Sequence, residues 1–185
     1  MQFLRDNGSR VSRLAITHIA MSIFGLVLFG ATNQKDATLM LAASIFSVIF
    51  YAVIVYTTMW EYGAKDKPAF DAERKQGAWK CGFLVSMIAE GFWFLLSILS
   101  MLEVFAESVK PMSRVCYVIL ILTHSCFTGI ETFVRNTYAI GKDARFWLAF
   151  LYIAGSVLIS LAAATGYLFG TKDMRIIPKK NTAKK

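Results

Sequence analysis

The hydrophobic residues of this chain are grouped into five long blocks instead of alternating with polar residues. The blocks cover residues 14–31, 38–60, 81–105, 115–134 and 146–170. An α-helix rises about 1.5 Å per residue, so each block has roughly the length that crosses a hydrocarbon core of about 30 Å. The second and fifth blocks contain no charged residue, so neither has the polar face of a helix on a soluble core. The pattern predicts an integral membrane protein.

The blocks also exclude a membrane β-barrel, whose strands are about 10 residues long and alternate apolar with polar positions. We therefore expect an all-α polytopic helical bundle, with residues 1–185 forming a single transmembrane domain that ends in a basic tail over 171–185. Three arginines precede the first block, as they would in a secretory signal. The block is longer than the apolar part of a signal and lacks a clear cleavage site, so we expect an uncleaved first helix.

The number of crossings depends on the fourth block, which is the most polar. With five crossings, the lysines and arginines divide eleven to nine between the two sides, which hardly selects an orientation under the positive-inside rule. If the fourth block re-entered on one side, the division would be fourteen to six. The run VCYVILILTHSCFTGI is nevertheless apolar enough to cross. We expect five crossings with a cytoplasmic N-terminus, and four crossings plus a re-entrant fourth segment is the alternative.

Composition and charge agree with a multi-pass membrane protein. Hydrophobic residues make up 56% of the chain and charged residues 17%, against about 25% charged residues in soluble domains. The net charge of +8 is concentrated in ERKQGAWK and in the tail, where basic side chains contact anionic lipid headgroups. No motif for reading nucleic acid accompanies the charge. The expected partners are the lipid bilayer and either another membrane protein or a second copy of the chain.

Polar residues within the third and fourth blocks recur at helical spacing, which places each set on one helix face. The third block carries Ser86, Glu90, Trp93, Ser97 and Ser100, and the fourth carries His124, Thr128, Glu131 and Arg135. If both blocks cross the membrane, Glu90 and His124 lie at similar depths, and His18 lies in the same half of the first block. We therefore expect an intramembrane polar cluster of Glu90, His124, Thr128 and His18, with a Glu131–Arg135 ion pair nearer the mouth.

A charge at mid-helix costs about 3 kcal/mol or more, so the position of Glu90 requires an explanation. Two interpretations of this cluster stay open. Glu90 with a histidine could serve proton-coupled transport or gating. It could equally form hydrogen bonds that only hold helices together. For His124 and His18 alone we favour packing, and for Glu131–Arg135 we favour an interfacial or solvated pair over a substrate clamp.

The last block carries small residues at a spacing that lets helices approach closely. These residues are Ser156, Ser160, Ala164, Gly166 and Gly170. We favour packing against the protein's own helices, and an oligomer or partner interface is the alternative.

Catalytic and cofactor-binding motifs are not found. The sequence has no phosphate-binding glycine loop, no HExxH and no GxSxG. Its three cysteines form no CxxC, so no metal and no cofactor are expected. We expect a small non-enzymatic membrane protein that assembles as a subunit with partner membrane proteins or with itself. The alternative is a self-sufficient small transporter or channel, proton-coupled through the Glu/His stripe.

Two short stretches, WEYGAKDK at Trp60–Lys67 and GYLFGTKD at Gly166–Asp173, resemble a group of uncharacterised small multi-helix membrane proteins of Gram-positive bacteria. The resemblance implies a bacterial plasma membrane location. It implies no activity and assigns no functional residues.

Overall fold

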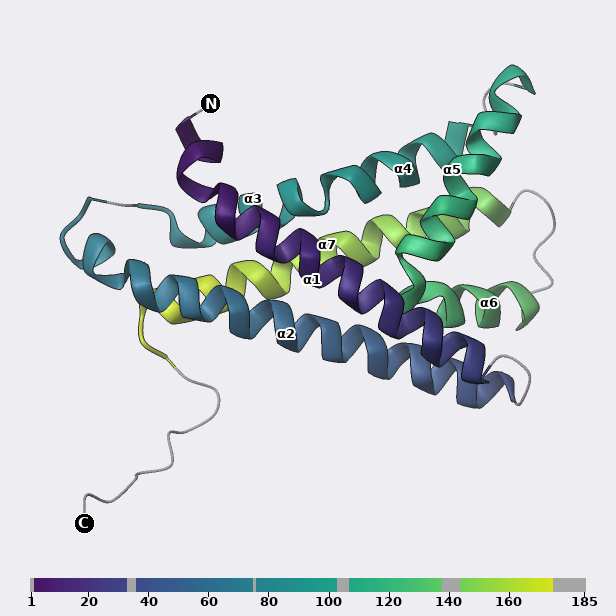
Figure 1. Ribbon diagram of the computed structural model, residues 1–185, viewed down its shortest axis with the longest axis horizontal. Helices are drawn as coiled ribbons and strands as arrows, with labels where there is room; N and C mark the ends of the chain where they lie inside the picture. Colours follow the sequence, from purple (N-terminus) through teal and green to yellow (C-terminus); the bar gives the residue numbers. More distant parts are fainter. Residues whose placement is uncertain (1, 33–35, 75, 103–106, 138–143, 175–185) are drawn as a thin grey trace, which may run out of the picture.

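The computed structural model describes residues 2–32, 36–74, 76–102, 107–137 and 144–174, and these residues form helices and no strands (Figure 1). The helices are α1 (Gln2–Thr32), α2 (Ala37–Asp71), α3 (Ala78–Ala89), α4 (Gly91–Met101), α5 (Lys110–Thr123), α6 (Thr128–Thr137) and α7 (Ala144–Thr171), with the short 3₁₀ helices η2 (Glu107–Val109) and η3 (Ser125–Phe127) on either side of α5. The basic tail beyond residue 174 lies outside the described residues.

Three to five helical segments are able to cross a membrane. Helices α1, α2 and α7 are each long and apolar enough by themselves. Two further segments qualify as bent pairs, α3 with α4 at 60° and α5 with α6 at 82°. Large apolar side chains are exposed on the outside, among them Ile16, Phe46, Ile49, Phe92 and Leu95, as expected for contact with lipid. The predicted all-α class is confirmed for the described residues, and at least three of their helices have the length and composition of membrane spans.

Two helices extend well beyond their hydrophobic blocks. Helix α1 starts at Gln2 and α2 continues to Asp71, which makes α2 about 52 Å long. Their ends are joined by Arg10, whose guanidinium lies 2.8 Å from the carboxylate of Asp66, and by Tyr167 of α7, whose hydroxyl donates to the same carboxylate. Hydropathy marks only the part of a helix that lies in lipid, so the hydrophobic blocks underestimated the length of both helices.

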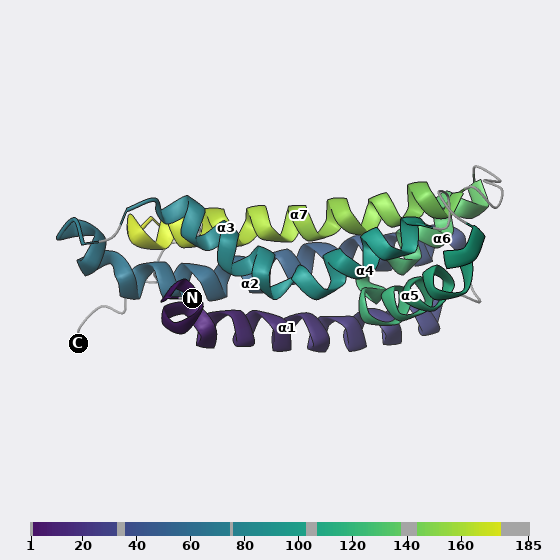
Figure 2. The same ribbon diagram turned by 90° about the horizontal axis from the view of Figure 1, so that it is seen from above.

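The start of α1, the end of α2 and the end of α7 lie at the same end of the bundle, as the Arg10–Asp66–Tyr167 contacts and the hydrogen bond from Trp60 Nε1 to the carbonyl of Met174 require. Helices α1, α2, the α3–α4 pair and α7 run the length of the bundle, and Figure 2 shows α1 and α7 on opposite sides of it.

The fourth segment does not run the length of the bundle. Helix α5 enters from the end opposite to the N-terminus, and α6 turns back toward that same end (Figure 1). By its bend of 82° the fourth segment has the shape of a broken span or of a re-entrant loop, and it is not a single straight helix.

The turn between α5 and α6 lies inside the protein, where other helices satisfy its backbone. The carbonyl of Thr123 accepts from His18 Nε2 at 3.0 Å and from the Ser22 hydroxyl, and the carbonyl of Cys126 accepts from the Ser44 hydroxyl. Irregular backbone at membrane depth is stable only when its polar groups are paired within protein or water. These side chains of α1 and α2 explain why an apolar run breaks in its middle.

Close packing of α1 against the same turn depends on a glycine. A Cβ on Gly25 would lie 2.5 Å from the backbone nitrogen of Cys126, a distance that packed atoms do not reach. Small residues allow helices to approach to this extent. Gly25 therefore lets the turn sit directly on α1.

The small residues of α7 contact helices of the same chain. A Cβ on Gly166 would overlap the carbonyl oxygen of Tyr56, and a Cβ on Gly170 would overlap that of Trp60, both on α2. Ser156, Ser160 and Ala164 are fully buried, and the Ser160 hydroxyl lies 3.2 Å from that of Ser86 on α3. The face of α7 that carries Gly166 and Gly170, a GxxxG pair, therefore packs against α2.

Candidate functional site

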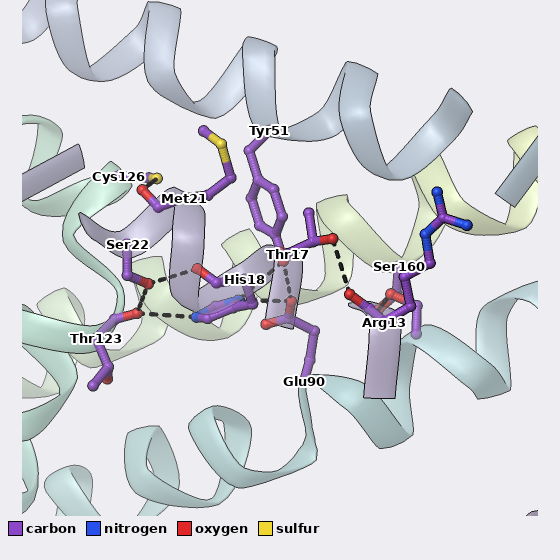
Figure 3. A network of polar contacts seen from close by, with 11 residues as sticks. Arg13, Thr17, His18, Met21, Ser22, Tyr51, Glu90, Thr123, Cys126 and Ser160 are labelled. Atoms are coloured by element: carbon purple, nitrogen blue, oxygen red, sulfur yellow. Dashed lines mark hydrogen bonds and ion pairs between the residues drawn. The ribbon is translucent and has the colours of Figure 1, made fainter. Parts of the chain in front are cut away.

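A buried polar cluster lies where the bend of the third segment meets the turn of the fourth. Glu90 sits at the bend between α3 and α4, directly before Gly91. Its Oε1 atom lies 2.9 Å from Nδ1 of His18 on α1 and accepts a hydrogen bond of 2.6 Å from the Tyr51 hydroxyl on α2 (Figure 3). The carboxylate therefore joins three segments in the bundle interior.

His18 uses both of its ring nitrogens in the cluster. Nε2 faces the carbonyl of Thr123 at 3.0 Å, and a carbonyl only accepts, so Nε2 carries a hydrogen. Nδ1 lies 2.9 Å from Glu90 Oε1 and 3.0 Å from the Tyr51 hydroxyl, so it is within hydrogen-bond distance of both groups.

Aromatic rings enclose the two histidines. The Trp93 ring stacks on His18 with 3.8 Å between ring centroids, and the centroids of His18 and His124 are 4.7 Å apart. His124 in turn stacks on Phe127 at 5.0 Å and meets the edge of Tyr152 at 5.6 Å. All these side chains are buried, so the cluster is shielded from bulk water and lipid.

Several polar atoms of the cluster have no hydrogen-bond partner within the described residues. They are Oε2 of Glu90, both ring nitrogens of His124 and Nε1 of Trp93. A buried polar atom without a partner costs about 1–3 kcal/mol, and native proteins contain few of them. Three unpaired atoms on two adjacent ionisable side chains indicate a site that can accept a ligand.

The structure brings together three of the four residues that were expected to form the intramembrane cluster: Glu90, His124 and His18. Thr128 is different, because its hydroxyl donates to the carbonyl of Ile121 at 3.2 Å and helps to cap the turn. The similar depths of Glu90 and His124 were expected for a fourth block that crosses the membrane. The bent segment also brings His124 to the cluster, because the middle of the block is the tip of the turn and therefore reaches the bundle interior.

The polar stripe of the third block faces the interior along its whole length, with every one of its five side chains at most 6% exposed. Sequence reasoning missed Tyr51, which lies in the uniformly apolar second block. A single tyrosine in such a block carries no periodic signal, so only its position beside Glu90 identifies it.

Glu131 lies in a separate buried site and not at a solvated mouth. Its side chain is only 1% exposed, and its carboxylate accepts hydrogen bonds from Tyr117 and from Tyr152, the latter at 2.7 Å. Arg135 is half exposed and lies 3.9 Å away. The expected Glu131–Arg135 ion pair is therefore present, with its glutamate buried instead of solvated. The turn before α6 points Glu131 inward, toward α5 and α7.

We expect Tyr152→Phe to lower the free energy of unfolding by about 2 kcal/mol, because a hydrogen bond to a buried charged group is lost. Tyr56→Phe is the matched control, since the Tyr56 hydroxyl has no partner within the described residues. Equilibrium unfolding in mixed detergent and SDS measures both variants. Equal stabilities of the two variants would contradict the assigned hydrogen bond.

Comparisons with known proteins identify no relative. No family model, no curated protein and no solved structure matches this chain. The function is therefore argued from the geometry of the buried cluster.

Proposed function

We propose that the protein is a small, non-enzymatic transporter or channel of the plasma membrane that binds a cation at the cluster of His18, Glu90 and His124. The observation that carries the proposal is the set of unpaired ligand atoms on Glu90 and His124 at the meeting point of two broken segments. A bound cation would be coordinated by the two kinds of acceptor atom present there, a carboxylate oxygen and imidazole nitrogens.

Broken helices at membrane depth support this proposal. In many transporters the substrate and ion sites lie near the bilayer midplane and are formed by interrupted helices, whose carbonyl ends coordinate cations. Here the C-terminal end of α5 stops at Thr123, whose carbonyl faces His18. The partial negative charge of a helix C-terminus favours a cation nearby.

The unpaired polar atoms of the cluster argue against a purely structural role. Polar groups that only hold helices together are expected to satisfy one another. The Glu131 site meets that expectation, because both of its oxygens accept from tyrosines. The Glu90 cluster leaves one carboxylate oxygen and a whole imidazole unpaired.

We also propose four crossings with the α5–α6 segment re-entrant and the N-terminus in the cytoplasm. Fourteen of the twenty lysines and arginines then lie on the cytoplasmic side, in the N-terminal residues, the 61–80 loop and the tail. Such a bias agrees with the positive-inside rule. Anionic lipid headgroups on that side would contact these residues.

The test is ion flux into proteoliposomes, followed with a pH-sensitive dye and with a panel of monovalent and divalent cations. We expect flux in the native protein and at least a tenfold loss in Glu90→Gln, because the substitution removes the charge and retains the shape. Glu131→Gln is the matched control, a buried carboxylate outside the cluster, and should retain flux. Equal flux in native protein and Glu90→Gln would refute the proposed role.

The second candidate is an accessory subunit. The observation that favours it is the C-terminal part of α2, which extends beyond the hydrophobic block and exposes the charged side chains Glu61, Lys65 and Asp71 for docking. Purification of the tagged chain in mild detergent tests this role. A stoichiometric membrane partner would support a subunit, and a clean monomer without one would favour the transporter or channel.

A further inference from the structure

We propose that the cation bound at this cluster is a divalent first-row transition-metal ion of the Zn²⁺ class, held by His18 Nδ1, a Glu90 carboxylate oxygen and one ring nitrogen of His124. This inference rests on the proposed function, because it identifies the cation for the same site. It differs from the expectation of no metal, which depended on ligand spacing along the sequence. The three ligands come instead from α1, from the α3–α4 bend and from the tip of the fourth segment.

The distances fit such an ion with small side-chain movements. One ligand atom from each residue lies within 4.8 Å of the others. Zinc binds imidazole nitrogen and carboxylate oxygen at about 2.0–2.2 Å in tetrahedral geometry, so ligand atoms around it lie about 3.4 Å apart. Closing the difference needs a contraction of about 1.4 Å at most. His124 can provide it, because no hydrogen bond fixes its ring.

The remaining contacts orient the ligands as metal sites usually require. A metal-binding histidine generally donates its other ring N–H to a carbonyl or carboxylate, which fixes the tautomer and the ring. His18 does so through Nε2 to the carbonyl of Thr123. The Tyr51 hydroxyl donates to Glu90 Oε1, the oxygen that also faces His18 Nδ1, and so orients the carboxylate beside that nitrogen. These groups would keep Nδ1 and the carboxylate directed at the same point.

The donor set selects the class of metal. Two imidazoles with one carboxylate suit zinc, iron and neighbouring ions, whereas calcium and magnesium prefer sites built from oxygen ligands alone. Two other carboxylates that are buried or partly buried in the described residues lack this set. Glu131 is surrounded by tyrosines, and Asp66 by Arg10 and Tyr167. The metal is therefore assigned to the Glu90 cluster alone.

The experiment is a Zn²⁺ titration of the full chain in mild detergent, after removal of bound metal with a chelator, followed by calorimetry. We expect one Zn²⁺ per chain and at least a tenfold lower affinity in Glu90→Gln and in His124→Gln. Glu131→Gln should bind as the native protein does, and excess Mg²⁺ should not compete. The absence of saturable 1:1 binding, or equal affinities in Glu90→Gln and Glu131→Gln, would overturn the proposal.

A measurement on the native protein keeps the test independent of whether the variants fold. X-ray absorption of the Zn²⁺-loaded chain should show two imidazole ligands and one carboxylate, and a spectrum without imidazole would overturn the proposal. The flux assay separates the two hypotheses. Glu90-dependent flux without Zn²⁺ binding would leave the proposed function standing and refute the metal. Zn²⁺ binding at the cluster without flux of any ion would support the metal site and refute the proposed transporter or channel function.

Discussion

Gly170→Ala is expected to lower the free energy of unfolding by about 3 kcal/mol, at the upper end of the cost of overpacking. The added methyl group would overlap the carbonyl oxygen of Trp60 and approach the backbone of Ala64 to 2.8 Å. Both neighbours are backbone atoms of a helix, so neither can rotate away as a side chain would. Helices α2 and α7 would have to separate along one of the most extensive contacts in the bundle.

Gly30→Ala is the matched control for this substitution. Gly30 also lies within a helix, but a Cβ there meets no atom within 4 Å. Because alanine is the better helix former, this variant should be unchanged or up to about 1 kcal/mol more stable. Unfolding in SDS, followed by circular dichroism, compares the two variants. If Gly170→Ala keeps native stability and instead changes the mass of the particle, the GxxxG is an oligomer face and the packing in the structure does not describe it.

Glu90→Ala is expected to destabilise the protein by about 3 kcal/mol, because the truncation removes two buried hydrogen bonds and leaves Nδ1 of His18 and the Tyr51 hydroxyl only their 3.0 Å contact with each other. Nδ1 of His18 would lose its carboxylate partner, and the hydroxyl of Tyr51 would lose a hydrogen bond of 2.6 Å. Polar contacts between membrane helices often contribute only about 0.6 kcal/mol. The larger effect is expected here because one side chain serves helices α1 and α2 together.

Two further variants show whether this loss arises from the cluster. Ser97→Ala removes a buried hydroxyl that bonds only to the carbonyl of Trp93 in its own helix, and it should cost no more than about 1 kcal/mol. Glu90→Gln keeps an acceptor for Tyr51 and should lose less stability than Glu90→Ala. Unfolding titrations measure all three. Equal losses in Ser97→Ala and Glu90→Ala would show that Glu90 does not join the helices.

Together these substitutions separate folding from function at Glu90. If Glu90→Gln folds normally and loses flux or metal binding, the carboxylate charge serves the activity and not the fold. The comparison depends on Glu131, a second buried carboxylate with complete hydrogen bonding. Its replacement by glutamine controls for the general effect of neutralising a charge in the bundle.

The hydrophobic pattern by itself determined the class of the protein and the places of its five segments. Long uniform blocks predict membrane helices because every backbone polar group in lipid must be paired within its own helix. The spacing of the third block also predicted its buried face, since helical periodicity is a local property. Glu90, Trp93 and Ser97 all point inward as expected.

Only the tertiary structure decided the path of the fourth segment and the composition of the site. The turn after Thr123 is stable because hydroxyls of Ser22 and Ser44 and the ring of His18 satisfy its carbonyls, and none of these partners is near it in sequence. The same turn buries Glu131 and carries His124 to Glu90. Tyr51 joins the cluster through a contact between α2 and the α3–α4 bend. Local periodicity reports which face of a helix is polar, but the partner on a neighbouring helix depends on how the whole bundle packs.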